Sequence, residues 1–280
     1  MPLTVQQIKG RLKSVAQKNH ADARILMRLY MMERFLERLS KSKYSDDFII
    51  KGGILVTSMI GVSMRSTMDI DTTIRNLNLS EEDMKKIVED FAALDIDDGI
   101  NFLIKDVSTI MDDMEYPGVR ITMDAYVGKT VTPLKIDIST NDIITPRAIE
   151  YKYKLLLEER EINLWSYNLE TILAEKMQTI LARGLLNTRM RDFYDIHVLL
   201  MMYRESIDDA ILVSAFEATC KKRGSEQLSM EGEQIIQNIE NDLKILRLWE
   251  SYQKKFTYAA EISYNEVIDS IKELFKLITT

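Results

Sequence analysis

The sequence predicts an α+β fold in which a strand-rich middle section lies between two helical sections. Between residues 5 and 40, apolar residues recur at three- and four-residue steps, which indicates two helices. Between residues 48 and 140, short runs rich in β-branched residues are separated by turn residues, as is typical of strands. Beyond Pro146, helical periodicity continues to Thr280, apart from a short strand candidate at residues 151–157.

The middle section contains the individual strand and helix candidates. The strand candidates are residues 48–50, 68–74, 101–111, 116–127 and 132–140. The helix candidates are residues 54–60, directly after Gly52-Gly53, and residues 79–94, where Ser80 is a suitable N-cap. We therefore divide the chain into three parts: N-terminal helices (residues 1–45), a strand-rich core (46–160) and a helical C-terminal domain (161–280).

Composition limits the class of protein and of metal site. A chain of 280 residues with 46% hydrophobic residues can bury a sizeable core. The sequence has neither a signal-like N-terminus nor a long apolar run, so we expect a cytoplasmic protein without a membrane segment. One cysteine and two histidines exclude a zinc cluster, which leaves carboxylates and a hard cation such as Mg²⁺. The net charge of -7 argues against a uniformly basic nucleic-acid binder but allows a local basic groove.

Two acidic residues, Asp69 and Asp71, form the first candidate metal site. Strand alternation places both on one face, with Ile70 on the other. A cation between them would offset their repulsion, whereas the alternative is an edge strand with solvated acids. Gly52-Gly53, at the start of the preceding short helix, is suited to bind phosphate through backbone N–H groups. The combination favours phosphate chemistry at a metal.

The third carboxylate of this site is Asp137 or Asp124. Alternation in LKIDIS places Lys135, Asp137 and Ser139 on one face, while Asp124 lies on a neighbouring strand candidate. Three carboxylates can hold two Mg²⁺ ions. Such ions activate an attacking hydroxyl and stabilise a triphosphate and its leaving pyrophosphate.

Two cations lie on the apolar arc of the helix predicted at residues 169–183. Lys176 is in the middle of that arc, and Arg183 falls on nearly the same azimuth. They either snorkel out of an apolar face or reach an anion such as a nucleoside triphosphate. Asp192, in the next helical segment, is either a helix cap or a functional residue, and Asp195 is a candidate partner of Arg191.

Three stretches resemble the AbiEii/AbiGii-type toxins, nucleotidyltransferase-like proteins of type IV toxin–antitoxin and phage abortive-infection systems. They are FIIKGGILVTSMIGVSMRSTMDIDTTIRNL, LKIDISTNDIITP and YNLETILAEKMQTILARGLLNTRMRDFYDIHVLL, and they span residues 48 to 200 in the family's order. The resemblance implies a polymerase-β-like nucleotidyltransferase core with a helical C-terminal part that contributes to the active-site cleft. Residues 1–45 and 205–280 carry no matching motif.

The resemblance also implies roles for individual residues. Asp69 and Asp71 would bind metal, Lys176 would contact nucleotide, and Asp192 would belong to a further active-site motif. Arg65 and Ser66 lie where the family places basic and polar residues. The turn Gly52-Gly53 departs from the Gly-Ser common in the superfamily, so a hydroxyl contact to phosphate would come from Thr57 or Ser66, or be absent.

We therefore expect a Mg²⁺-dependent nucleotidyltransferase toxin that moves a nucleoside monophosphate from an NTP to a macromolecule, with RNA, and tRNA ends in particular, as the leading acceptor. The alternatives are transfer to a protein or a small molecule such as an aminoglycoside, and nucleotide binding without turnover. By the resemblance, the antitoxin counters the toxin without a tight complex. Without a sustained heptad pattern, the chain is expected to be a monomer.

Overall fold

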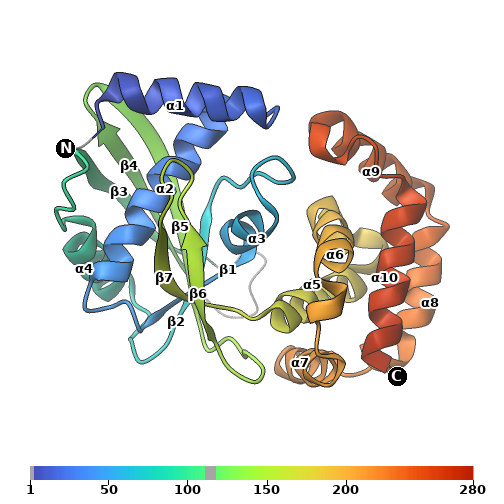
Figure 1. Cartoon of the computed structure of the whole chain (residues 1–280). Helices are drawn as coiled ribbons and strands as arrows, with labels where there is room; N and C mark the ends of the chain where they lie inside the picture. Colours follow the sequence, from blue (N-terminus) through green and yellow to red (C-terminus); the bar gives the residue numbers. More distant parts are fainter. Residues whose placement is uncertain (1–2, 111–117, 280) are drawn as a thin grey trace. The chain divides into compact units, whose positions relative to one another are not determined.

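The computed structural model describes residues 3–110 and 118–279, which form two compact units (Figure 1). Unit 1 comprises Met1–Asp142 and Ile149–Ser166, and unit 2 comprises Ile143–Ala148 and Tyr167–Thr280. Met111, Tyr116 and Pro117, at the ends of two predicted strands, lie outside the described residues. Among the described helices, none combines the length and apolar character that crossing a bilayer requires.

Unit 1 contains the sheet and four helices within its described part. Its elements are α1 (Val5–Lys18), α2 (Ala23–Lys41), β1 (Phe48–Lys51), α3 (Gly52–Ile60), β2 (Ile70–Ile74), α4 (Glu81–Ala92), β3 (Ile100–Ile110), β4 (Gly118–Val127), β5 (Thr130–Thr140), β6 (Ile149–Lys154) and β7 (Glu161–Ser166). The predicted N-cap Ser80 is confirmed, because its hydroxyl accepts the Asp83 N–H at the start of α4.

In the described part of unit 2, all regular secondary structure is helical. Its elements are α5 (Leu169–Arg183), η1 (Gly184–Leu186), α6 (Met190–Tyr203), η2 (Arg204–Ser206), α7 (Asp209–Lys222), α8 (Leu228–Glu240), α9 (Leu243–Lys255), η3 (Thr257–Ala259) and α10 (Tyr264–Thr279). The predicted α+β class is confirmed by this combination of a mixed sheet with helices.

The seven strands form one mixed sheet in the order β3-β4-β5-β2-β1-β7-β6. At its centre, β2 pairs parallel with β5 and antiparallel with β1, and β1 pairs parallel with β7. The sheet therefore brings together strands that are far apart in the sequence. β2 and β5, which carry the candidate carboxylates, are direct neighbours.

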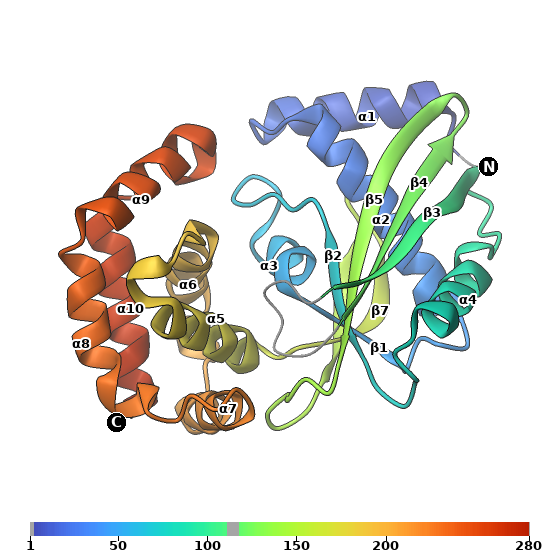
Figure 2. The same ribbon diagram turned by 180° about the vertical axis from the view of Figure 1, so that it is seen from behind.

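One face of the sheet is apolar and is covered by helices. Figures 1 and 2 show α2 crossing the strands on this face. Phe91 of α4 contacts both Phe35 of α2 and Phe48 of β1, with ring centroids 5.0 and 5.8 Å apart. Since successive residues of a strand point to opposite faces, the polar residues that alternate with this core project from the other face.

The strand β7 was not predicted. Helical periodicity was expected after Pro146 except for residues 151–157, and this expectation was wrong at Glu161–Ser166, which form a strand between β1 and β6. The segment is short, and pairing on both edges stabilises it more than its own composition does.

Two buried glutamates of α2, Glu33 and Glu37, hold the β6–β7 connection in place. Both carboxylate oxygens of Glu33 accept the Leu156 N–H, at 3.1 and 3.0 Å, and burial raises the pKa of this carboxyl to about 8. Glu37 forms a bidentate pair with Arg160, with both contacts at 2.8 Å. These contacts fix a connection that comes late in the chain to a helix near its start.

Candidate active site

A row of four charged side chains crosses the polar face of the sheet. Lys51 on β1 is opposite Asp71 on β2, Asp71 is opposite Asp137 on β5, and Asp137 is opposite Arg120 on β4. Residues in register on neighbouring strands point to the same face. The two carboxylates therefore lie side by side at the centre of the sheet, with a cation on each outer side.

Asp71 is fixed by the first turn of α3. The Gly53 N–H donates to Asp71 Oδ2 at 3.0 Å. Gly52 has a φ of 57°, and a methyl group on it would lie 2.8 Å from Asp71 Cγ; a methyl group on Gly53 would lie 2.5 Å from Thr67 Oγ1. Both glycines are thus required by the close approach of α3 to this part of the chain.

The residues predicted to assist at the glycine turn occupy different environments. The Arg65 side chain is buried, 2% exposed, and donates to the Gly53 carbonyl at 2.7 Å and to Thr57 Oγ1 at 3.0 Å. Thr57 is also buried, whereas Ser66 is partly exposed. Arg65 therefore braces the start of α3, and its predicted contact with nucleotide stays a prediction.

Asp69 and Asp137 share a lysine. Lys135 Nζ lies 3.1 Å from Asp69 Oδ2 and 3.8 Å from Asp137 Oδ2. Asp69 is the more exposed of the two, at 37% of its side-chain surface against 12% for Asp137. Arg120 holds both oxygens of Asp137, at 2.8 and 2.9 Å. Alternation in the sequence predicts Lys135 on this face, but no local pattern predicts the pairing with Arg120.

A second lysine continues the polar face. Lys51 Nζ donates to Ser139 Oγ at 2.8 Å and also to Asp142, and Ser139 Oγ donates to the same Asp142 carboxylate. Sequence reasoning missed Lys51, because its position in the row depends on the pairing of β1 with β2.

The register distinguishes the two candidates for the third carboxylate. Asp137 is the residue opposite Asp71, whereas Asp124 lies on β4 opposite Pro133, two strand positions beyond the pair of Thr122 with Lys135. Asp124 instead accepts a hydrogen bond from Tyr126 at 3.3 Å. Of the two, only Asp137 therefore lies next to Asp71.

The donor set on this face fits a hard cation. Asp69, Asp71 and Asp137 offer only oxygen atoms, the ligand type that Mg²⁺ prefers. Two of these carboxylates already have a cation, the Lys135 ammonium, between them. Within residues 3–110 and 118–279, no three His, Cys, Asp or Glu side chains are arranged as a closed metal-binding group.

In unit 2, the predicted residues Lys176 and Asp192 form a buried ion-pair cluster. Lys176 Nζ donates to Asp192 Oδ1 at 2.9 Å and to Asp195 Oδ2 at 2.6 Å, and Arg189 Nε donates to Asp192 Oδ2 at 2.9 Å. Burial alone would raise the pKa of the Asp192 carboxyl, but the charges of Lys176 and Arg189 outweigh it and lower this pKa. The lysine side chain is 11% exposed.

The structure of this part of unit 2 distinguishes the alternatives that the sequence left open for Asp192 and Asp195. α6 begins at Met190, so Asp192 lies in its first turn and does not cap a helix that starts at Phe193. Asp195 pairs with Lys176, a partner that the i,i+4 pattern did not indicate. Arg183, the other predicted nucleotide contact, is the last residue of α5 and is partly exposed.

The sequence matches a family model over residues 34–274, and the model describes the nucleotidyl transferase AbiEii toxin of type IV toxin–antitoxin systems. The match covers most of the chain. This chain belongs to the AbiEii toxin family. This AbiEii toxin is therefore a nucleotidyltransferase, and its family implies an NTP substrate and an antitoxin partner.

The solved structures that this chain matches include JHP933 from Helicobacter pylori, which is 17% identical over 91% of this chain and 93% of that chain, with a TM-score of 0.48. An antigenic nucleotidyltransferase-like protein from Paracoccidioides brasiliensis is 15% identical over 82% of this chain and 94% of that chain, with a TM-score of 0.36. At these similarities no residue role is transferred from them. No curated protein shows significant sequence similarity to the toxin.

The glycine turn allows a matched test of the Asp71 contact. Gly52→Ala and Gly224→Ala both place a methyl group at a φ of 57°, at a cost of about 1–3 kcal/mol each. Only at Gly52 does the new Cβ meet Asp71, since nothing lies within 4 Å of the corresponding position at Gly224. In chemical denaturation, Gly52→Ala should lose more free energy of unfolding than Gly224→Ala. Equal losses would show that the Asp71 contact is not tight.

The unit 2 cluster predicts a pH-dependent effect of Lys176→Met. At neutral pH this variant removes the Lys176 ammonium from two buried carboxylates, of which Asp192 keeps its contact with Arg189, and this should lower the free energy of unfolding by about 3 kcal/mol. Because the folded-state pKa of Asp192 is lowered, the wild-type advantage is present above the ordinary pKa of 3.8 and is lost as pH falls below it. Lys221→Met, at an exposed lysine of α7, is the control and should match wild type. A loss that is independent of pH in urea titrations would contradict this account.

Proposed function

We propose that this AbiEii toxin transfers a nucleoside monophosphate from an NTP to RNA, with the end of a tRNA as the acceptor, and that Asp69, Asp71 and Asp137 hold the Mg²⁺ ions this reaction uses. The observation that carries the proposal is the in-register pair of Asp71 and Asp137, placed beside the glycine start of α3. Asp69, which shares Lys135 with Asp137, supplies the third carboxylate.

Bound Mg²⁺ would lower the pKa of the attacking hydroxyl and offset the charge of the triphosphate and of the leaving pyrophosphate. The chain's own residues prepare this site. The Gly53 N–H orients one oxygen of Asp71, and Arg120 fixes both oxygens of Asp137. Lys135 allows two carboxylates to lie close together, because its ammonium reduces their mutual repulsion.

Further residues are proposed to contact the nucleotide. The Gly53 N–H at the start of α3 already donates to Asp71, so the proposed contribution of this turn to phosphate binding is the positive end of the helix dipole. Ser66, partly exposed, is the better candidate for a hydroxyl contact than the buried Thr57. We assign the buried Arg65 to positioning the turn.

In unit 2, Lys176 and Arg183 are the proposed cationic contacts to the nucleotide. Asp192 and Asp195 hold the Lys176 ammonium in one orientation, which reduces the entropy that a long side chain would lose on binding phosphate. Arg183 is partly exposed and is the last residue of α5.

Nucleotide transfer is tested by incubating the toxin with each radiolabelled NTP, Mg²⁺ and total cellular RNA and protein. RNA should gain label, and Asp69→Asn, Asp71→Asn and Asp137→Asn should each lower the rate about a hundredfold or more while remaining folded. Asp124→Asn is the matched control, because it removes a carboxylate from the same sheet, four residues along β4 from the partner of Asp137, and should transfer like wild type.

The distribution of label distinguishes the other functions. Label on protein or on a small molecule would replace RNA as the acceptor. No label on any fraction, from a folded preparation that is toxic in cells, would favour nucleotide binding without turnover. Full transfer by well-folded Asp69→Asn and Asp71→Asn would remove the metal assignment.

We further propose that the toxin acts in phage abortive infection as a monomer, and that its antitoxin opposes it without a tight complex. The sequence has no sustained heptad of the kind that stable helical partners use. Gel filtration of tagged toxin with untagged antitoxin at micromolar concentration should give separate peaks, with the toxin at monomer mass. Co-elution of the two proteins would establish direct binding as the restraint.

A further inference from the structure

The helix α9 in unit 2 carries a basic face. Its buried side consists of Ile245, Trp249 and Tyr252. Its exposed side carries four cations within residues 243–255 and one acidic residue, Glu250, although the whole chain has a net charge of -7. The cations are Lys244, Arg247, Lys254 and Lys255. At 1.5 Å per residue the helix spans roughly 20 Å, enough to reach several consecutive phosphates.

A shallow hollow lies on the first half of this basic face. Its volume is about 440 Å³, and it is lined by Leu243, Lys244, Arg247, Leu248 and Ser251. Apolar side chains therefore lie directly beside two cations. Leu243 is 66% exposed, so the hollow presents apolar surface to a ligand as well as charge. A flat apolar group attached to an anion has the chemistry to fit it.

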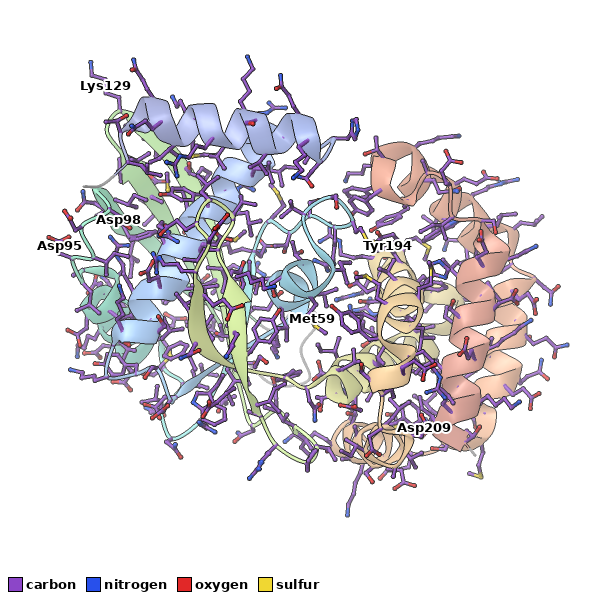
Figure 3. All side chains as sticks on the ribbon, in the orientation of Figure 1. Met59, Asp95, Asp98, Lys129, Tyr194 and Asp209 are labelled. Carbon is purple, nitrogen blue, oxygen red and sulfur yellow. The ribbon has the colours of Figure 1, made fainter. Side chains whose placement is uncertain are left out.

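Two aromatic rings lie directly after the C-terminal end of α9. Phe256 and Tyr258 are partly exposed and stacked, with centroids 5.3 Å apart and an interplanar angle of 24°. Behind them lies the buried Tyr194 of α6, labelled in Figure 3, whose ring centroid is 4.9 Å from that of Tyr258. Arg191 Cζ and Lys255 Nζ lie over the Phe256 ring, 5.7 and 5.4 Å from its centroid.

We propose that residues 244–258 bind an unpaired stretch of the acceptor RNA, with the four α9 cations contacting phosphates and a base packing against the exposed part of the Phe256–Tyr258 pair. This inference rests on the proposed function and adds the surface that receives the acceptor. Cations in line with aromatic rings are the combination that single-stranded nucleic acid requires, because phosphates need positive charge and unstacked bases need a flat apolar partner. In a duplex the bases are already stacked on one another, so unpaired RNA is the favoured ligand.

The position of Arg191 strengthens this assignment. It precedes Asp192 in α6 and lies over Phe256, so the aromatic pair is in direct contact with the segment that carries the Lys176–Asp192 cluster. A base bound at Phe256 would therefore lie close to the first turn of α6, in the same unit. An acidic protein partner would use the cations but would have no need of the stacked rings.

The test measures binding without NTP or Mg²⁺, using fluorescence anisotropy of a short fluorescein-labelled single-stranded RNA. Lys254→Gln/Lys255→Gln removes two phosphate contacts, and the slope of log K against log salt should become shallower by about 1.4. Phe256→Leu keeps an apolar side chain but removes the ring, and should weaken binding about tenfold with an unchanged salt slope.

Matched controls carry equal changes elsewhere. Lys9→Gln/Lys13→Gln removes two exposed lysines from α1, and Phe102→Leu removes a partly buried ring on β3 that also contacts an arginine. Both should bind RNA like wild type, and thermal melting monitors the fold of each variant. Failure of the wild type to bind the RNA, equal affinity of Phe256→Leu and wild type, or tighter binding of a duplex would each overturn the proposal.

The assay separates this proposal from nucleotide transfer. Asp69→Asn should bind the RNA like wild type, because the carboxylates belong to unit 1 and no metal is present. If RNA is labelled but the α9 and Phe256 variants bind normally, the proposed surface is wrong and the transfer proposal stands. If the variants weaken binding as expected but no RNA is labelled, the surface stands and RNA is not the acceptor of a transfer reaction.

Discussion

Asp71 accepts the Gly53 N–H at the point where β1 passes directly into α3, and the geometry of the carboxylate site depends on this contact. The hydrogen bond needs β2 and α3 so close that a side chain at Gly52 would collide with Asp71. Arg65 supports the same turn from the buried side. One carboxylate is thus oriented by backbone before any ligand arrives, which is the rigid kind of support that a precise site requires.

The charges around this contact balance one another across the sheet. Two neighbouring carboxylates repel, and the protein offsets this with Lys51 and Arg120 at the outer positions and Lys135 next to Asp69. Each cation is held by hydrogen bonds or ion pairs, so the compensation is local. Unit 2 uses the same principle around Lys176, with the signs reversed: one cation is held by two buried carboxylates.

Much of the architecture follows from local sequence patterns. The helical periodicity of residues 5–40 and the alternation in the strands around Asp71 and Asp137 predict those elements, and strand alternation also places each acidic side chain on the polar face. Alternation does not predict which strands pair with each other. The choice between Asp137 and Asp124, and the pairing of Arg120 with Asp137, depend on register, which long-range pairing decides.

The dependence on long-range pairing also explains why β7 and the Asp195–Lys176 contact were not predicted. β7 forms because two strands flank it, so its six residues carry little signal of their own. Asp195 on α6 pairs with Lys176 on α5. Spacing rules within one helix predict only pairs that are three or four residues apart, so they cannot predict this contact. Sequence therefore predicts which residue types are functional more readily than it predicts which of them touch.

The strand order has a consequence for synthesis of the toxin. The chain leaves unit 1 after Asp142 and returns at Ile149 to add β6 and β7, so β1 gains its second neighbour only from Glu161–Ser166. On the ribosome, every earlier stage leaves one edge of β1 with unpaired N–H and C=O groups. Such an edge pairs readily with other chains. A chain that ends before this strand therefore lacks one neighbour of β1, and the sheet of unit 1 is complete only when its last strand has been made.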